Sequence, residues 1–195
     1  MKCRRPLTPR ARLIALLLMD VDGVLTDGRI SLVGKEMEGK AFDVKDGVGL
    51  WLARRVGLRT GVISGRGGPG VARRAAELGM GEVHLGVVDK LQTYLRVARR
   101  LKLADAQICY VGDDVTDLPI LARVGMPVAV ADAHDEVLRR VPFVTRASGG
   151  RGAVREVVDA ILRAQGKWRD VLSWFEPERT PGRRNRRTVG AEGPR

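Results

Sequence analysis

Apolar and polar positions alternate in blocks along this chain, and the blocks predict strands and helices in turn. The first block, residues 13–19, is wholly apolar and ends abruptly at Asp20 and Asp22. A continuous apolar run of this length is typical of a strand buried on both faces of a parallel sheet. Further short apolar runs predict strands over residues 58–63, 83–85, 108–111, 127–130 and 143–144.

Helical patterns separate these strands and complete the fold prediction. Apolar residues at helical spacing predict helices over residues 48–56, up to residue 78, and over 90–101, 134–140 and 153–164. Two short stretches on either side of Gly34 and Lys35 predict a β-hairpin, which is either an ordinary edge hairpin or a flap beside Asp20. The alternation predicts an α/β fold, a three-layer Rossmann-like parallel sheet with helices on both faces.

Length and charge divide the chain into one domain and two basic ends. We expect a basic leader over residues 1–12, one domain over 13–167 and a basic, disordered tail over 168–195. The net charge of +12 comes mostly from the ends, since residues 1–12 carry five basic and no acidic side chains. Charge in solvated ends does not indicate specific nucleic-acid binding. Two cysteines predict no disulfide framework, and no segment is long enough to cross a membrane.

Polar residues follow the predicted strands, where the carboxyl ends of parallel strands form ligand sites. They are Asp20 and Asp22 after the first strand, Ser64 and Arg66 after the second, and Asp113 and Asp114 after the fourth. Paired carboxylates suit Mg²⁺, whereas a hydroxyl, an arginine and Lys90 in a first helical turn suit phosphoryl oxygens. Asp114 could instead cap the helix that follows. The residues alone therefore predict a magnesium-dependent phosphotransfer site.

The order of four motifs resembles that of the haloacid dehalogenase-like phosphohydrolases. The motifs are DVDGVLT at 20–26, SGR at 64–66, Lys90, and GDDVTD at 112–117. The resemblance implies that Asp20 is the nucleophile and Asp22 the general acid and base, while Ser64 and Lys90 hold the phosphoryl group. It also implies a magnesium site formed by the Asp20 carboxylate, the Asp22 main-chain oxygen and Asp113, with Asp114 and Asp117 in support.

Many members of this superfamily carry a cap domain over the active site, for which this chain has no room. Only 41 residues separate Asp22 from Ser64, and 25 separate Ser64 from Lys90. The predicted hairpin, helices and strand fill both intervals. We therefore expect a capless enzyme in which a neighbouring subunit excludes water from the site.

A closer resemblance is to the 3-deoxy-D-manno-octulosonate 8-phosphate phosphatases, over roughly residues 13–167. It rests on KAFDVKDGVG at 40–49, AVADAH at 129–134 and GGRGAVREV at 149–157. The resemblance implies a cytoplasmic homotetramer that acts in lipopolysaccharide biosynthesis. It also implies the substrate-binding residues, which are Asp22, Asp43, Val44, Lys45, Asp46, Gly47, Arg66, Arg74 and Lys90.

Two departures from that pattern leave the identity of the substrate undecided. Trp51 stands where the family is expected to have arginine, and Asp43 replaces an asparagine. A capless phosphatase for another sugar acid phosphate, such as a nine-carbon one, is therefore an alternative. Outside the enzyme class, a signalling receiver domain and a non-catalytic binding homologue are further alternatives. Neither fits a DxDG loop combined with the later GDDxxD motif as well as a phosphatase does.

Overall fold

A single central sheet organises the computed structural model, which describes residues 2–3, 8–33 and 37–176. Its seven strands lie in the order β1-β9-β8-β7-β2-β5-β6. They are β1 (Lys2–Cys3), β2 (Leu16–Met19), β5 (Arg59–Ile63), β6 (Glu82–His84), β7 (Ile108–Gly112), β8 (Met126–Ala129) and β9 (Phe143–Val144). β1 pairs antiparallel with β9, and the other six strands are parallel to one another.

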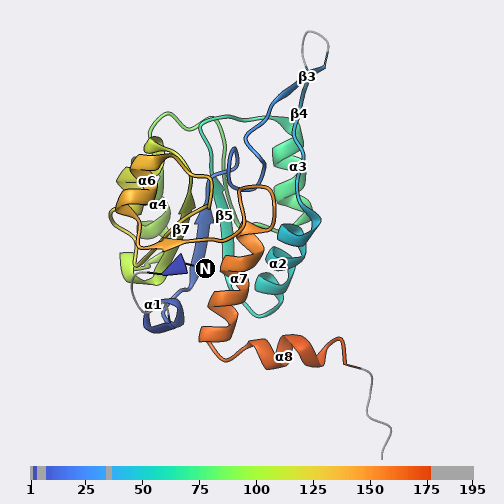
Figure 1. Ribbon diagram of the computed structural model, residues 1–195, viewed down its shortest axis with the longest axis vertical. Helices are drawn as coiled ribbons and strands as arrows, with labels where there is room; N and C mark the ends of the chain where they lie inside the picture. The colour runs from blue at the N-terminus through green and yellow to red at the C-terminus, as the bar shows by residue number, and fades with distance from the viewer. Residues whose placement is uncertain (1, 4–7, 34–36, 177–195) are drawn as a thin grey trace, which may run out of the picture.

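Helices cover both faces of this sheet (Figure 1). They are α1 (Thr8–Arg12), α2 (Val44–Arg55), α3 (Pro69–Glu77), α4 (Lys90–Leu101), α5 (Leu118–Leu121), α6 (Asp135–Arg140), α7 (Ala153–Ala164) and α8 (Trp168–Ser173), with short 3₁₀ helices η1 (Asp105–Gln107) and η2 (Val115–Asp117). Figure 1 shows α2, α3 and α7 on one side of the sheet and α4 and α6 on the other. The three-layer α/β prediction is confirmed.

An antiparallel hairpin projects from one end of the molecule (Figure 1). It consists of β3 (Ser31–Val33) and β4 (Met37–Gly39). We call β3, β4 and the following Lys40 the arm. The predicted turn at Gly34 and Lys35 lies outside the described residues. Between β2 and β5 the described chain forms the arm and α2, so it has no cap domain there.

The central strand β2 explains why polar residues meet at one edge. Every β2 residue is fully buried, as its apolar sequence predicts, because β5 and β7 flank it and helices cover both faces. Met19 pairs with Val62 of β5 and with Val111 of β7 in parallel register. The residues that follow these three strands therefore emerge side by side at the carboxyl edge of the sheet.

The ends of the chain differ from the expected boundaries. β2 begins at Leu16 rather than Leu13, whose side chain is 58% exposed in the turn after α1. Within the expected leader, β1 pairs with β9 and α1 contacts α7. Within the expected tail, residues 168–173 form α8, with Val171 buried, and residues 177–195 lie outside the described part. No helix in the described part is long and apolar enough to cross a membrane.

Candidate active site

A tight turn after β2 places the first two carboxylates. The backbone N–H of Asp20 donates to Val111 O of β7 (3.0 Å), so the chain is still held by the sheet at this residue. Val21 O then accepts the backbone N–H groups of Leu25 (2.9 Å) and Thr26 (3.0 Å), which closes the turn. Asp22 lies inside the turn, and its side chain is 20% exposed.

Gly23 in this turn allows close contact with β7's carboxyl end. Its φ is +85°, which favours glycine, and a Cβ there would lie 2.0 Å from Asp113 Oδ2. A larger residue at this position would push Asp113 away from Asp20. The glycine of the DVDG motif is therefore needed to bring the two acidic loops together.

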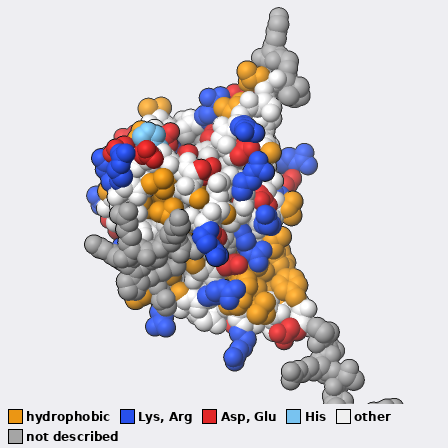
Figure 2. All heavy atoms as spheres, viewed as in Figure 1, with side chains coloured by type: hydrophobic (Ala, Val, Ile, Leu, Met, Phe, Trp, Pro, Cys, Tyr) orange, Lys and Arg blue, Asp and Glu red, His pale blue; other side chains and the backbone are white. Residues whose placement is uncertain are grey.

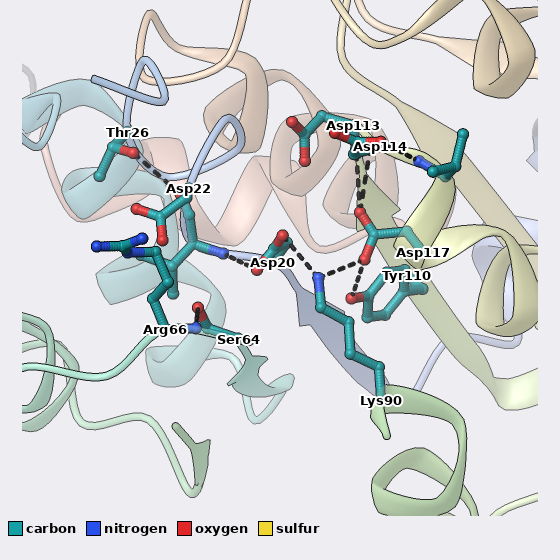
Figure 3. A network of polar contacts seen from close by, with 12 residues as sticks. Asp20, Asp22, Thr26, Ser64, Arg66, Lys90, Tyr110, Asp113, Asp114 and Asp117 are labelled. Carbon is teal, nitrogen blue, oxygen red and sulfur yellow. Dashed lines mark hydrogen bonds and ion pairs between the residues drawn. The ribbon is translucent and has the colours of Figure 1, made fainter. Parts of the chain in front are cut away.

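The Lys90 ammonium joins Asp20 to Asp117, as Figure 3 shows. Lys90 Nζ donates to Asp20 Oδ2 (2.7 Å) and to Asp117 Oδ1 (2.8 Å), while Val21 N–H donates to Asp20 Oδ1 (2.7 Å). Both side chains of the Lys90–Asp20 pair are 9% exposed. Lys90 is the first residue of α4, and the preceding Asp89 caps the helix by accepting from Gln92 N–H.

Asp117 is fully buried at the centre of the acidic loop that follows β7, which also contains Asp113 and Asp114. Besides Lys90, its Oδ1 accepts from Tyr110 Oη (2.8 Å), and its Oδ2 accepts the backbone N–H groups of Asp113 (3.0 Å) and Asp114 (3.4 Å). Four donors occupy its two oxygens, so Asp117 fixes the loop and Lys90. Asp114, by contrast, is exposed and accepts from its neighbour Val115 N–H (2.5 Å) at the N-cap of η2.

The electrostatics of these carboxylates favour an added cation. Burial, with the nearby Asp117 charge, raises the pKa of Asp20 to about 6, against the opposing effect of Lys90. The same two causes raise the pKa of Asp113 to about 8. Burial lowers the pKa of Lys90, but the carboxylates of Asp117 and Asp20 outweigh it and raise that pKa overall. One ammonium does not neutralise three clustered carboxylates.

Oxygen atoms of Asp20, Asp113 and Asp117 lie within 4.8 Å of one another, a separation that one metal ion could bridge. Asp113 Oδ1 is buried and has no hydrogen-bond partner within the described part of the chain. Asp117 already has its four donors, so the acceptors that remain for a cation are on Asp20 and Asp113. Hard carboxylate oxygens of this kind suit Mg²⁺.

A cavity of about 740 Å³ opens above these groups. Its lining includes Asp20, Asp22, Ser64, Arg66, Lys90, Asp113 and Asp114. Ser64 directly follows β5, is buried, and accepts the backbone N–H of Arg66 (3.3 Å). The structure therefore brings together at one cavity the residues predicted for phosphoryl transfer and metal binding.

Comparison with known proteins identifies the family. Residues 76–157 match the family model of haloacid dehalogenase-like hydrolases. The 3-deoxy-D-manno-octulosonate 8-phosphate phosphatase KdsC of Escherichia coli (strain K12) is 44% identical over 158 residues, which cover 81% of this chain and 84% of the relative. The chain belongs to the haloacid dehalogenase-like hydrolase family.

Solved structures of family members share the fold. The 3-deoxy-D-manno-octulosonate 8-phosphate phosphatase from Yersinia pestis has a TM-score of 0.82 and 43% identity, over 83% of this chain and 88% of that one. The corresponding enzyme from Moraxella catarrhalis, in complex with magnesium, phosphate and the sugar acid, has a TM-score of 0.84 and 35% identity. That match covers 87% of this chain and 97% of the other.

The structure does not bring the second group of predicted residues to this cavity, because residues 43–47 and Arg74 are absent from its lining. Asp43 caps α2 by accepting from Lys45 N–H (2.7 Å), and the adjacent Val44 is 74% exposed. Gly47 is buried against Arg74, since a Cβ there would lie 2.2 Å from Arg74 Nη2. In the single chain Val44 and Lys45 are exposed at the start of α2, outside this cavity, whereas Asp46 and Gly47 are buried.

The Asp46 side chain binds the start of α7 and is not open to the cavity. It is buried, and it accepts the backbone N–H groups of Gly152 (3.2 Å) and Arg155 (2.7 Å) at the start of α7. This explains how GGRG and KDG, distant in the sequence, come to lie together. Lys45 lies beside the same loop, since a Cβ on Gly152 would be 3.8 Å from Lys45 Cε.

Sequence reasoning missed two residues of the site. Tyr110 lies in the middle of β7, and its buried hydroxyl donates a hydrogen bond to Asp117. Lys40 of the arm lies 2.7 Å from Asp22 Oδ1 and 2.9 Å from Asp22 Oδ2. A tyrosine in an apolar strand and a lysine after a hairpin have no local signal for such roles. Only the packing of the arm and of β7 reveals them.

Trp51, one of the two departures from the family pattern, belongs to an aromatic surface cluster. Its side chain is 39% exposed, and its ring lies 6.4 Å from that of Phe175 after α8. The Arg55 guanidinium lies between Trp51 and Trp174, at 4.9 and 4.7 Å from their ring centroids. Figure 2 shows the hydrophobic patch over α2 and α8 to which this cluster belongs. Trp51 therefore packs against the segment that follows α8.

Proposed function

We propose that this chain is a magnesium-dependent phosphatase that converts 3-deoxy-D-manno-octulosonate 8-phosphate to the free sugar acid and phosphate in lipopolysaccharide biosynthesis. The observation that carries the proposal is the position of Asp20. It lies at the carboxyl end of β2, held by Lys90 and Val21 N–H, in a cavity that Asp22 and Asp113 also line. Relatives named for this activity are more than 40% identical to the chain over the aligned residues.

The residues present fit a resident Mg²⁺. Asp20 and Asp113, with the Asp22 main-chain oxygen, would hold the ion, and the unpartnered Asp113 Oδ1 faces no competing donor in the described structure. When bound, the ion neutralises charge on the carboxylates and on the phosphoryl oxygens. Asp117 supports the site through the backbone of Asp113 and Asp114.

Different side chains of this cavity carry out different steps of the reaction. An Asp20 oxygen attacks phosphorus, the bond from phosphorus to the sugar oxygen breaks, and an aspartyl-phosphate forms. Asp22 gives its proton to the leaving oxygen and then takes one from the water that hydrolyses the aspartyl-phosphate. Ser64 and Lys90 donate hydrogen bonds to the phosphoryl oxygens, which keeps the group in line for both steps.

The sugar acid would extend from the cavity toward Arg66 at its rim. Arg66 is half-exposed and pairs with Glu38 of the arm (2.7 Å). Residues 43–47 and Arg74, which do not line this cavity, would contact the sugar acid once the chain assembles as a homotetramer. Such an assembly also excludes water from a capless site. A cytoplasmic location follows from the same pathway.

Phosphate release from a panel of sugar acid phosphates tests this proposal. With Mg²⁺, the eight-carbon 8-phosphate should be hydrolysed in preference to the nine-carbon 9-phosphate and to simple sugar phosphates. Asp20→Asn keeps the shape but removes the attacking charge, so it should abolish turnover while the protein stays folded. A matched control is Asp170→Asn, at an exposed position of α8 that does not line the cavity. Preference for the nine-carbon compound would reassign the substrate, and full activity of Asp20→Asn would refute the mechanism.

A further inference from the structure

A lysine of the arm is buried in contact with Asp22. The Lys40 side chain is only 4% exposed, and its ammonium lies 2.7 and 2.9 Å from the two Asp22 oxygens. Lysine is almost never buried unless its charge is paired, because removing an ammonium from water costs several kcal/mol. The Asp22 carboxylate is the partner that makes this burial possible.

Among the described residues of the arm, the Lys40–Asp22 pair is the main polar contact with the domain. Leu32 of β3 is 76% exposed, so it does not pack the arm onto the domain. The other ion pair, between Glu38 and Arg66, has side chains that are 36% and 52% exposed. Exposed pairs of that kind contribute about 0–1 kcal/mol. The arm therefore docks at its base, where Lys40 meets Asp22.

Each of the two DVDG carboxylates thus has its own lysine. Lys90, from the start of α4, holds Asp20, whereas Lys40, from the end of the arm, holds Asp22. Figure 3 shows Lys90 and Asp22 on opposite sides of Asp20. The two lysines therefore act on different carboxylates and are not interchangeable.

We propose that Lys40 is a positioning residue for the general acid and base, an inference that rests on the proposed phosphatase function. The ammonium fixes the Asp22 carboxyl group at the mouth of the cavity, facing the oxygen that leaves phosphorus. Lys40 acts through Asp22 and makes no contact with the phosphoryl group.

The dependence on leaving group distinguishes this role from a general structural one. A sugar alkoxide needs the proton from Asp22 to leave, whereas 4-nitrophenolate leaves without it. Lys40→Met keeps the aliphatic stem and removes the charge. In single-turnover measurements with Mg²⁺, it should slow leaving-group release from an alkyl phosphate by on the order of 10²-fold. Release from 4-nitrophenyl phosphate should fall by less than about tenfold, since only the hydrolysis step then needs Asp22.

A double-mutant cycle with Asp22→Asn tests whether the effect passes through Asp22. In the Asp22→Asn background, Lys40→Met should slow leaving-group release from the alkyl phosphate by less than about twofold. The reason is that the effects of substituting two residues that act as one unit are not additive. Glu38→Gln is the matched control on the same arm, and it should leave the ratio of the two substrates' rates unchanged. Thermal unfolding of each variant verifies that it is folded.

Equal losses on both substrates, or additive losses in the cycle, would overturn the positioning role. A wild-type protein that releases phosphate from neither substrate would overturn the phosphatase proposal and this inference with it. If wild type hydrolyses an alkyl phosphate other than the eight-carbon sugar acid phosphate, only the named substrate fails. The Lys40 comparison is then made with the alkyl phosphate that the enzyme accepts.

Discussion

Replacing Asp117 by asparagine tests the physical account of the acidic site most directly. The substitution keeps the shape of a fully buried side chain but turns one carboxylate oxygen into an NH₂ group. If that group replaces Oδ1, it faces the donors of Lys90 and Tyr110. If it replaces Oδ2, it faces the backbone N–H groups of Asp113 and Asp114. Two donors lose their acceptor in either orientation.

Two opposing effects set the size of the change. Hydrogen bonds to a charged group contribute about 1.5–3 kcal/mol each, so losing two costs about 3–6 kcal/mol. Removing the Asp117 charge also relieves its repulsion of Asp20 and Asp113, whose pKa values it raises. One pKa unit corresponds to about 1.4 kcal/mol, which makes the relief on the order of 1–2 kcal/mol. We expect Asp117→Asn to lower the free energy of unfolding by about 2–4 kcal/mol.

Urea denaturation in the presence of a chelator measures this change without the metal. With a slope of about 2 kcal/mol per M, the midpoint should fall by roughly 1–2 M. Asp114→Asn is the matched control, because asparagine caps a helix about as well as aspartate and the side chain is exposed. An Asp117→Asn protein as stable as wild type would show that repulsion among the carboxylates outweighs their hydrogen bonds, and the reasoning would be wrong.

Two further predictions concern metal and pH. Mg²⁺ should raise the midpoint of thermal unfolding, because a ligand at 100 times its Kd adds about 2.7 kcal/mol to the free energy of unfolding. Asp113→Asn should lose most of that increase. An equal shift in the variant would place the ion elsewhere. Burial raises the pKa of Asp46, although the N–H groups of Arg155 and Gly152 oppose this. The folded protein therefore binds more protons than the unfolded chain above pH 3.8, and stability falls as pH rises through the folded pKa. Asp46→Asn should remove this decline, so the difference in unfolding free energy between the two proteins should change with pH above pH 3.8, as the folded-state carboxyl of Asp46 loses its proton. A difference in unfolding free energy between the two proteins that stays constant with pH would contradict this role of Asp46.

Local sequence patterns were enough to predict the sheet and the edge at which the site forms. The apolar run before Asp20 predicted a strand buried on both faces, and all of β2 is fully buried. Polar residues directly after strands were expected to converge, since parallel strands end at one edge, and Asp20, Ser64 and Asp113 do so. The start of β2 was misplaced because Leu13 is as apolar as the strand residues, and only packing exposes it.

Tertiary structure alone decided which partner each charged group has. The sequence by itself determined the α/β fold, the lack of room for a cap domain between the motifs, and the set of carboxylates and cations around Asp20. It could not show that Lys40 is buried against Asp22, or that Asp46 binds the start of α7 rather than facing the cavity. Strand and helix periodicity depends on neighbours a few residues apart, whereas these pairs join residues 18 and 109 positions apart. Such contacts depend on how whole elements pack, and no local pattern encodes them.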